Sequence, residues 1–224
     1  LAHEIKNPLT PIQLTVDRLK IKYSEKIEKN EINDFEKSLK IIAKQIKQIE
    51  NLVNEFSDFA RMPKPILKDN NVVIIAKDNI NLLKELDKTI EINFKTPKSD
   101  IIFNSDNEQL SRVFFNLIKN SIESIQEKKQ DNPNFNGKID IEVVDNTSNI
   151  EFIIKDNGVG FKIFNDKIKD ILNPYFTTKE KGTGLGLAIV NKIINDHNGI
   201  LNFTSLTNGA KINIVFKKLW VLKY

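Results

Sequence analysis

The sequence predicts an α+β protein in which an N-terminal helical hairpin, forming a four-helix bundle as a dimer, precedes a two-layer α/β sandwich. Two observations support this fold. Up to Ala60 the apolar residues repeat at alternating steps of three and four, the period of helices that pack along a seam. Beyond Leu67 the chain changes to short β-rich runs, several of which alternate between apolar and polar residues.

The hairpin is predicted from two heptad seams separated by a polar stretch, residues 24–33. We expect Asn33 or Asp34 to cap the second helix. Two helices alone bury little apolar surface, so we expect a second copy to complete a four-helix bundle. The seam residues are Ile5, Leu9, Ile12, Val16, Leu19 and Tyr23, followed by Phe35, Leu39, Ile42, Ile46, Ile49, Val53, Phe56 and Ala60.

A pair of prolines marks the domain boundary. Pro63 cannot continue a helix, and proline also pushes the preceding residue toward extended geometry, so the second helix should end at Met62. We therefore expect a dimerisation hairpin at residues 1–62, a linker at 63–66 and a second domain at 67–224.

The second domain is predicted to be a mixed sheet with helices on one face. Alternating apolar residues such as Ile139, Ile141 and Val143 indicate strands that are covered on one side and exposed to water on the other. Ser105 and Glu108 form the pattern of a capping box. The expected strands are 72–75, 89–94, 100–103, 138–144, 150–155, 199–205 and 210–216, and the expected helices are 76–86, 106–126 and 185–196.

Composition excludes several classes of function. The chain has no Cys, which excludes disulfide scaffolds, thiolate zinc sites and cysteine nucleophiles. Its net charge of +4 comes almost entirely from lysines, whereas nucleic-acid readers favour arginine, so we expect no nucleic-acid partner. The longest apolar run, Val72–Ala76, is far short of the roughly 18 residues that a transmembrane helix needs.

A first candidate site lies at the start of the hairpin, at His3, Glu4 and Asn7. His3 precedes the seam residue Ile5 by two positions, which turns it about 200° around the helix, toward the outside. Two prolines nearby each cost about 3 kcal/mol inside a helix, a cost that often marks a functional site. A neutral imidazole there is a competent nucleophile, although a surface histidine at a fraying terminus is the alternative interpretation.

Two further clusters suit a nucleotide. Asn116 and Asn120 lie on one helix face, and Glu123 follows one turn later. Amide oxygens on this face can complete the coordination of Mg²⁺. The alternative interpretation is that an Asn-rich chain contains such a pair by chance. Asp156 follows a predicted strand and precedes Gly158 and Gly160. Its carboxylate would be a hydrogen-bond acceptor in a cleft, and the alternative interpretation is an ordinary turn.

The last cluster is a glycine-rich turn, residues 182–187, that leads into a helix. Backbone N–H groups at such a helix start suit phosphates, but the turn lacks the Lys-Ser/Thr ending of a P-loop. The 21 residues from Phe161 to Lys181 separate it from the preceding glycines, and we expect them to form a mobile lid.

Taken together and in this order, the clusters resemble the conserved boxes of bacterial sensor histidine kinases. His3 to Pro8 is similar to their H box, Asn116 to Asn120 to the N box, Asp156 to Gly160 to the G1 box, Pro174 to Thr178 to the F box, and Gly182 to Leu187 to the G2 box. At finer grain, residues 3–23 and 56–65 look like the NtrY branch, the nitrogen-regulation-type kinases.

This resemblance implies a histidine-phosphotransfer hairpin followed by an ATP-binding domain of the Bergerat (GHKL) type. His3 would be the phospho-acceptor, Glu4 would orient its imidazole, and Asn7 would position water during dephosphorylation. Asp156 would accept from the adenine amino group, and Asn120, with Asn116 beside it, would bind Mg²⁺. The other expected nucleotide-binding residues are Gly158, Gly160, Thr183, Gly184, Leu185 and Gly186.

The resemblance also implies a partner and a location. The partner would be the receiver domain of a response regulator, of the NtrX type by similarity, and the kinase would be a homodimer. We expect a cytoplasmic fragment of a protein anchored in the bacterial inner membrane only through segments upstream. The transfer helix of this family begins two to three turns before its histidine, so a start at Leu1 suggests a fragment. The segment 217–224 matches no element of the family that we can assign.

Two alternatives come from other classes. The related ATPases gyrase B, Hsp90 and MutL carry a glutamate as base where Asn116 stands, and an amide cannot take a proton from water. A nucleotide-binding dimeric adaptor without kinase activity is the second alternative. The presence of His3, Asn120, Asp156 and the three G2 glycines argues against a catalytically dead adaptor. A nucleotide titration would identify an adaptor that only dimerises and docks a partner.

Overall fold

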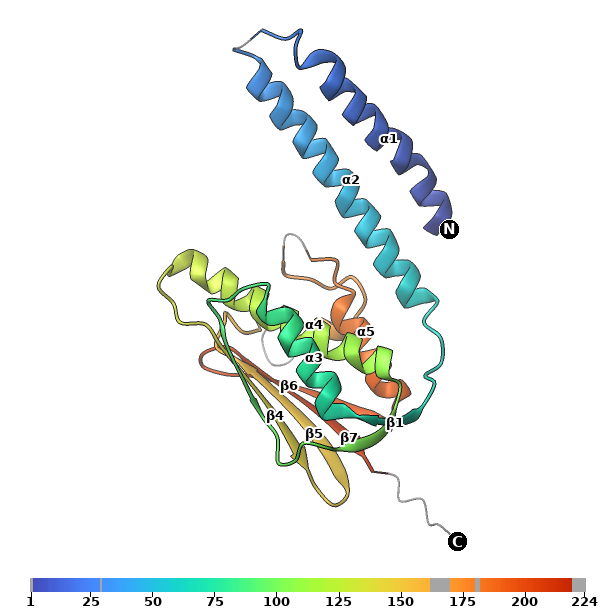
Figure 1. The fold of residues 1–224 in the computed structure, drawn as a ribbon, viewed down its shortest axis with the longest axis vertical. Coiled ribbons are helices and arrows are strands. Elements are labelled where there is room, and N and C mark those ends of the chain that lie inside the picture. Colours follow the sequence, from blue (N-terminus) through green and yellow to red (C-terminus); the bar gives the residue numbers. More distant parts are fainter. Residues whose placement is uncertain (1, 29, 162–169, 180–181, 219–224) are drawn as a thin grey trace. The chain divides into compact units, whose positions relative to one another are not determined.

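The computed structural model describes residues 2–28, 30–161, 170–179 and 182–218, with the side chains of residues 2 and 3 left out. It divides the chain into two compact units, Leu1–Pro63 and Lys64–Tyr224 (Figure 1). The first unit is a helical hairpin and the second is an α/β sandwich, as the sequence predicts.

The hairpin consists of α1 (Ala2–Tyr23) and α2 (Ile32–Ala60). Helix α1 continues through Pro8 and Pro11. The two helices pack through a small core of Leu9, Val16, Leu39 and Ile46. Other seam residues keep 37–45% of their surface exposed in the single chain, which leaves apolar surface for a further partner. These are Ile5, Ile12, Leu19, Tyr23, Ile42 and Ile49.

The predicted cap of α2 is wrong. The residue before the helix is Glu31, which makes no side-chain capping bond, and both Asn33 and Asp34 lie within the first turn. The chain already turns before the helix, because the N–H groups of Glu31 and Ile32 donate to the carbonyl of Glu28. These backbone bonds replace the side-chain cap.

The sandwich is built on a five-stranded mixed sheet in the order β2-β4-β5-β7-β6. The β2–β4 pair is parallel and the other pairs are antiparallel. A second, two-stranded sheet joins β1 to β3. The strands are β1 (Lys68–Asn71), β2 (Glu91–Lys95), β3 (Ile102–Ser105), β4 (Lys138–Asp145), β5 (Asn149–Asp156), β6 (Gly199–Ser205) and β7 (Ala210–Lys217).

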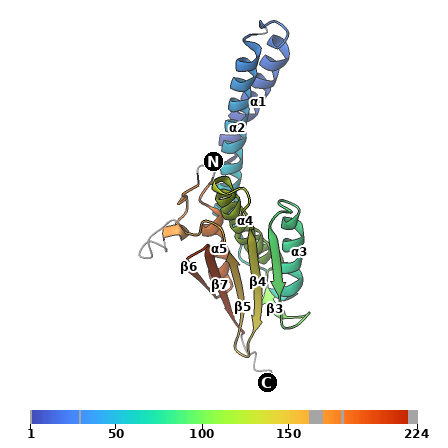
Figure 2. The same cartoon turned by 90° about the vertical axis from the view of Figure 1, so that its left-hand side faces the viewer.

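Three helices cover one face of the large sheet, as Figure 2 shows: α3 (Val72–Lys84), α4 (Asn107–Asp131) and α5 (Gly186–Asp196). The inward residues of the strands are buried, and the rings of Phe114 on α4 and Phe152 on β5 lie 5.0 Å apart. The outward residues of β4, such as Asp140 and Glu142, are partly or fully exposed. The prediction of a sheet covered on one side is therefore confirmed.

The strand predicted at Val72–Ile75 is wrong, because these residues form the first turn of α3. The side chain of Asn71 accepts a hydrogen bond from the N–H of Val73 at 3.1 Å and caps the helix. Val72 and Val73 are completely buried against the sandwich. Burial of a β-branched run in a capped helix has therefore overridden its strand propensity.

The capping residue of α4 also differs from the prediction. Asp106, and not Ser105, accepts from the N–H of Gln109, at 3.0 Å. Ser105 ends β3, and its hydroxyl donates to the carbonyl of Phe103. The predicted capping box therefore begins one residue too early.

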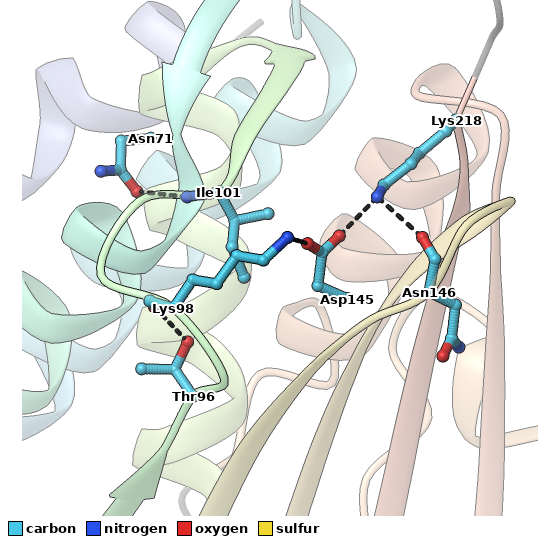
Figure 3. A network of polar contacts seen from close by, with 7 residues as sticks. All are labelled: Asn71, Thr96, Lys98, Ile101, Asp145, Asn146 and Lys218. Atoms are coloured by element: carbon cyan, nitrogen blue, oxygen red, sulfur yellow. Dashed lines mark hydrogen bonds and ion pairs between the residues drawn. The ribbon is translucent and has the colours of Figure 1, made fainter.

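A polar network closes one end of the large sheet (Figure 3). Asp145, at the end of β4, accepts from Lys98 at 2.8 Å and from Lys218, and its side chain is only 7% exposed. Lys218 also donates to the carbonyl of Asn146 at 2.7 Å. The two lysines hold the pKa of Asp145 below its usual range, Lys218 having the larger effect. The network joins the β2–β3 connection to the end of β7.

No helix in the described part of the chain combines the length and the apolar character needed to span a bilayer. Residues 219–224, most of the unassigned C-terminal segment, lie outside the described residues.

Candidate functional site

The candidate nucleotide site lies within the sandwich and begins on α4. Asn116 and Asn120 lie one turn apart on this helix, and both side chains are partly buried. The amide nitrogen of Asn116 donates to the carbonyl of Arg112 at 2.9 Å, which fixes the side chain. Its oxygen lies close to Gly186, where an added Cβ would be 3.4 Å away. The structure therefore brings the N box and the start of α5 together.

Asp156 ends β5 and lies under α4. Only 8% of its surface is exposed. One carboxylate oxygen accepts from the hydroxyl of Ser121 at 3.3 Å, and the other accepts from the N–H of Gly158 at 3.0 Å. Burial raises the pKa of Asp156, and the hydrogen bonds from Gly158 and Ser121 oppose this effect only in part. The site thus holds an acceptor that is shielded from water.

The turn after Asp156 is packed tightly against α4. The N–H of Val159 donates to the hydroxyl of Ser124 at 3.1 Å, and an added Cβ at Gly158 would collide with this serine. The ammonium group of Lys128 donates to the carbonyls of Asn157 and Gly158 at 2.8 and 3.2 Å. Glycine is thus required at 158 for a close approach of backbone and helix.

The G2 turn shows a second position that requires glycine. Gly184 has a φ of +70°, and its carbonyl accepts from the N–H of Tyr175 at 3.1 Å. A Cβ at Gly184 would lie 2.5 Å from the carbonyl carbon of Tyr175. Leu185 precedes α5, is fully buried and makes no side-chain capping bond. The first N–H groups of α5 are therefore not capped by this residue, which suits a phosphate at the helix start.

The predicted lid can be described only in part. Residues 162–169 and 180–181 of this segment lie outside the described residues, whereas residues 170–179 are described. Within the described part, the hydroxyl of Thr177 accepts from the N–H of Lys179 at 3.1 Å, and the ammonium group of Lys179 lies 2.5 Å from Glu123. The segment therefore contacts the G2 turn through Tyr175, whose N–H donates to Gly184, and α4 through Lys179, the residue just after the F box.

The predicted H box lies on α1, in the other unit. The backbone of His3 is part of the helix, but its side chain lies outside the described residues. Glu4 and Asn7 are described, and both are exposed. The structure therefore places the candidate nucleophile on a helix with accessible polar neighbours.

Sequence reasoning missed three residues on α4 that contact Asp156 and the turn after it: Ser121, Ser124 and Lys128. They follow one another at steps of three and four, so they share one face of the helix. This face lies next to the face of Asn116 and Asn120. The spacing was a usable signal, but nothing local indicates which strand end the face would contact.

The residues present fit a magnesium ion that is bound together with a nucleotide. No group of three or more His, Cys, Asp or Glu side chains suited to a metal occurs among the described residues. Amide oxygens such as those of Asn116 and Asn120 are hard ligands of the kind that Mg²⁺ accepts beside water and phosphate oxygens. A metal at this place would thus take most of its ligands from the nucleotide and from water.

Two family descriptions match the chain. The phospho-acceptor domain called His Kinase A matches residues 1–65, and the family of histidine kinase-, DNA gyrase B- and HSP90-like ATPases matches residues 105–219. Among curated proteins, an NtrY-like sensor histidine kinase of Rickettsia prowazekii is 38% identical over 217 residues, which is 96% of this chain and 35% of that protein. The nitrogen regulation protein NtrY of Azorhizobium caulinodans is 35% identical, over 97% of this chain and 28% of that protein.

A solved structure is similar over nearly the whole chain. The histidine kinase ThkA in complex with the response regulator protein TrrA matches with a TM-score of 0.68 and 25% identity, covering 97% of this chain and 60% of that one. The chain spans about a third of the length of the curated relatives named above. The two matched domains follow one another in the order predicted from the boxes.

Proposed function

The chain belongs to the sensor histidine kinases, in their NtrY branch, and from this membership we propose that it transfers a phosphoryl group from ATP to His3 and onward to a response regulator. The domains assigned to these steps are a dimerising phosphotransfer hairpin at residues 1–62, a linker at 63–66 and an ATP-binding domain at 67–224. The two compact units, Leu1–Pro63 and Lys64–Tyr224, support these bounds.

The assignment of His3 as the phospho-acceptor rests on the burial and the hydrogen bonds of the other histidine, His197. The chain contains two histidines, and His197 is only 6% exposed. Its Nδ1 lies 2.8 Å from the carbonyl of Ile193, which can only accept, so this nitrogen carries the proton. Its Nε2 accepts from the N–H of Asp106 at 3.0 Å. Both ring nitrogens are thus engaged, which leaves His3 as the histidine able to attack phosphorus.

The sandwich would bind the nucleotide between α4, the end of β5 and the start of α5. Asp156 accepts from the adenine amino group, with Gly158 and Gly160 forming the turn beside the base. The backbone N–H groups from Thr183 to Gly186 receive the phosphates. Asn120, with Asn116 beside it, holds Mg²⁺, which neutralises charge on the phosphate oxygens when it is bound.

In the transfer, a neutral imidazole nitrogen of His3 bonds to the γ-phosphorus as the bond to the bridging oxygen of the β-phosphate breaks, and ADP leaves. Glu4 orients the imidazole. The phosphoryl group then passes to an aspartate carboxylate of the receiver domain, and the imidazole is restored. Asn7 positions water when the phosphorylated regulator is hydrolysed. Asn116 supports transfer over hydrolysis of ATP, because its amide cannot act as the base that activates water.

The proposal includes a homodimer, supported by the exposed seam residues of the hairpin, such as Ile42 and Ile49. The response-regulator partner is supported by the similarity to ThkA, whose solved complex contains the regulator TrrA. A partner of the NtrX type and anchoring of the longer protein in the inner membrane are inferred from the similarity to the NtrY branch.

The test is incubation of the chain with Mg²⁺ and ATP labelled at the γ-phosphate. We expect an acid-labile and alkali-stable label on the unmodified chain and none on His3→Gln, which keeps the nucleotide pocket intact. Asn7→Ala should still incorporate label but should dephosphorylate a phosphorylated regulator more slowly. A label that persists in His3→Gln would contradict the assigned acceptor, and a chain that binds ATP without any label would favour the adaptor.

A further inference from the structure

An ion pair between the F-box segment and α4 has no part in the function proposed above. The ammonium group of Lys179 lies 2.5 Å from one carboxylate oxygen of Glu123, although the two residues are 56 positions apart. Their side chains are 34% and 37% exposed. Lys179 is about as exposed as Phe176 nearby, which keeps 36% of its surface, so the ion pair lies at the protein surface and solvent can reach it.

Glu123 places a negative charge on the face of α4 that carries the candidate metal ligands. It follows Asn120 by three positions and Asn116 by seven, spacings that align side chains along a helix. Its second carboxylate oxygen lies 3.8 Å from the ammonium group of Lys119. A bare carboxylate here would repel a triphosphate, and the two lysines neutralise it.

Lys179 is also tied to the glycine turn that should receive the phosphates. Its carbonyl accepts from the N–H of Gly182 at 3.1 Å, and its own N–H donates to Thr177. Two positions beyond Gly182, the carbonyl of Gly184 accepts from Tyr175, which brings the start of the F box to the same turn. The backbone of Lys179 is thus bonded to the G2 turn, and its ammonium group contacts Glu123, on the face of α4 that bears Asn120.

We propose that Lys179 exchanges partners during the reaction: it pairs with Glu123 in the free protein and with the terminal phosphate of ATP in the complex. The inference rests on the proposed function, since it assigns a residue that reads the γ-phosphate of the same nucleotide. The exchange requires little free energy, because partly exposed ion pairs contribute little to stability. A terminal phosphate carries more charge than a carboxylate, and Glu123 keeps Lys119 as its counter-ion.

The experiment is calorimetric titration of the full chain with Mg²⁺ and either β,γ-imido-ATP or ADP. Lys179→Gln should weaken the ATP analogue about 10-fold, the effect of losing a charged hydrogen bond, and should change ADP binding less than about twofold. Glu123→Gln should act in the opposite direction and tighten the analogue about two- to threefold, because it removes the competing partner of Lys179. Lys179→Arg should retain most of the affinity of the unmodified chain.

The opposite signs separate exchange from a structural role. If the ion pair only holds the F box in place, Lys179→Gln and Glu123→Gln will weaken both nucleotides alike, and the inference is then wrong. An unchanged affinity of Lys179→Gln for the analogue would also overturn it. Lys192→Gln is the matched control, because Lys192 forms a similarly exposed pair with Asp196 at 3.1 Å toward the end of α5 and should change neither affinity. Failure of the unmodified chain to bind either nucleotide would instead overturn the proposed function, and this inference with it.

Discussion

Replacing Ser121 by alanine tests how the hydroxyl group of this residue affects the pKa of Asp156, the proposed acceptor for adenine. Burial raises the pKa of Asp156, and the hydroxyl of Ser121 donates to its Oδ2 at 3.3 Å, which opposes that effect. Hydrogen bonds to charged groups contribute about 1.5–3 kcal/mol, and this bond is long, so we expect about 1 kcal/mol. Losing this hydrogen bond in Ser121→Ala should therefore raise the ratio of protonated to ionised Asp156 about fivefold at a given pH.

The assay follows Asp156 by the ¹³C chemical shift of its carboxyl group as the pH is varied, without nucleotide. Ser121→Ala should move the titration to higher pH. Ser124→Ala is the matched control, because Ser124 lies one turn further along α4 and contacts the N–H of Val159, not the carboxylate. An identical titration in Ser121→Ala and the unmodified chain would refute the assigned bond. A shift of equal size in Ser124→Ala would show that the effect comes from general loosening of the pocket.

Two further predictions concern stability and assembly. Asp145→Asn removes the carboxylate held by Lys98 and Lys218 and should lower the free energy of unfolding at pH 7 by about 1–2 kcal/mol in a urea titration. Because the pKa of Asp145 is lowered in the folded chain, this contribution is present above the ordinary aspartate pKa of about 4 and is lost as the pH falls through the lowered value, so the two chains should converge in acid. Ile42→Asp places a charge in the exposed part of the seam and should dissociate the dimer in sedimentation experiments, whereas Ile21→Asp, at a position 81% exposed and off the seam, should not. A monomeric unmodified chain at tens of micromolar, or an Ile42→Asp chain that remains dimeric, would contradict the seam assignment.

Periodic patterns in the sequence predict the architecture because they report burial directly. The alternation of Ile139, Ile141 and Val143 corresponds to a strand whose inner face is covered by helices. Local signals predict less well where two elements meet. Val72–Ile75 has strand propensity, but one side chain, Asn71, caps a helix there, and the buried face belongs to that helix. Propensity over four residues cannot outweigh a capped helix that packs on a core.

The residues of the candidate site likewise fall into those that a local pattern indicates and those that only the folded structure brings together. Asp156 and the glycines could be proposed from the sequence because a carboxylate at a strand end and glycines before a helix are local patterns that suit a ligand. The contributions of Ser121 and Lys128 could not, because each acts on a segment more than 25 positions away, and only the folded chain brings them together. Their roles depend on the position of α4 over the end of β5, which no local pattern specifies. The ion pair between Glu123 and Lys179 has the same origin.

Hydrogen bonds at Asp106 fix both helices of the candidate site, α4 and α5, at the ends that lie away from the site. Ile66 donates its N–H to Oδ2 of Asp106 at 2.8 Å, and Oδ1 of the same residue caps α4. Burial raises the pKa of Asp106, but the N–H groups of Gln109 and Ile66 outweigh this and hold it below its usual range. His197, just after α5, accepts from the N–H of Asp106. The helix that bears the N box and the helix that follows the G2 turn are thus joined at one residue, which also anchors the linker, so neither can shift without straining this hydrogen-bonded corner.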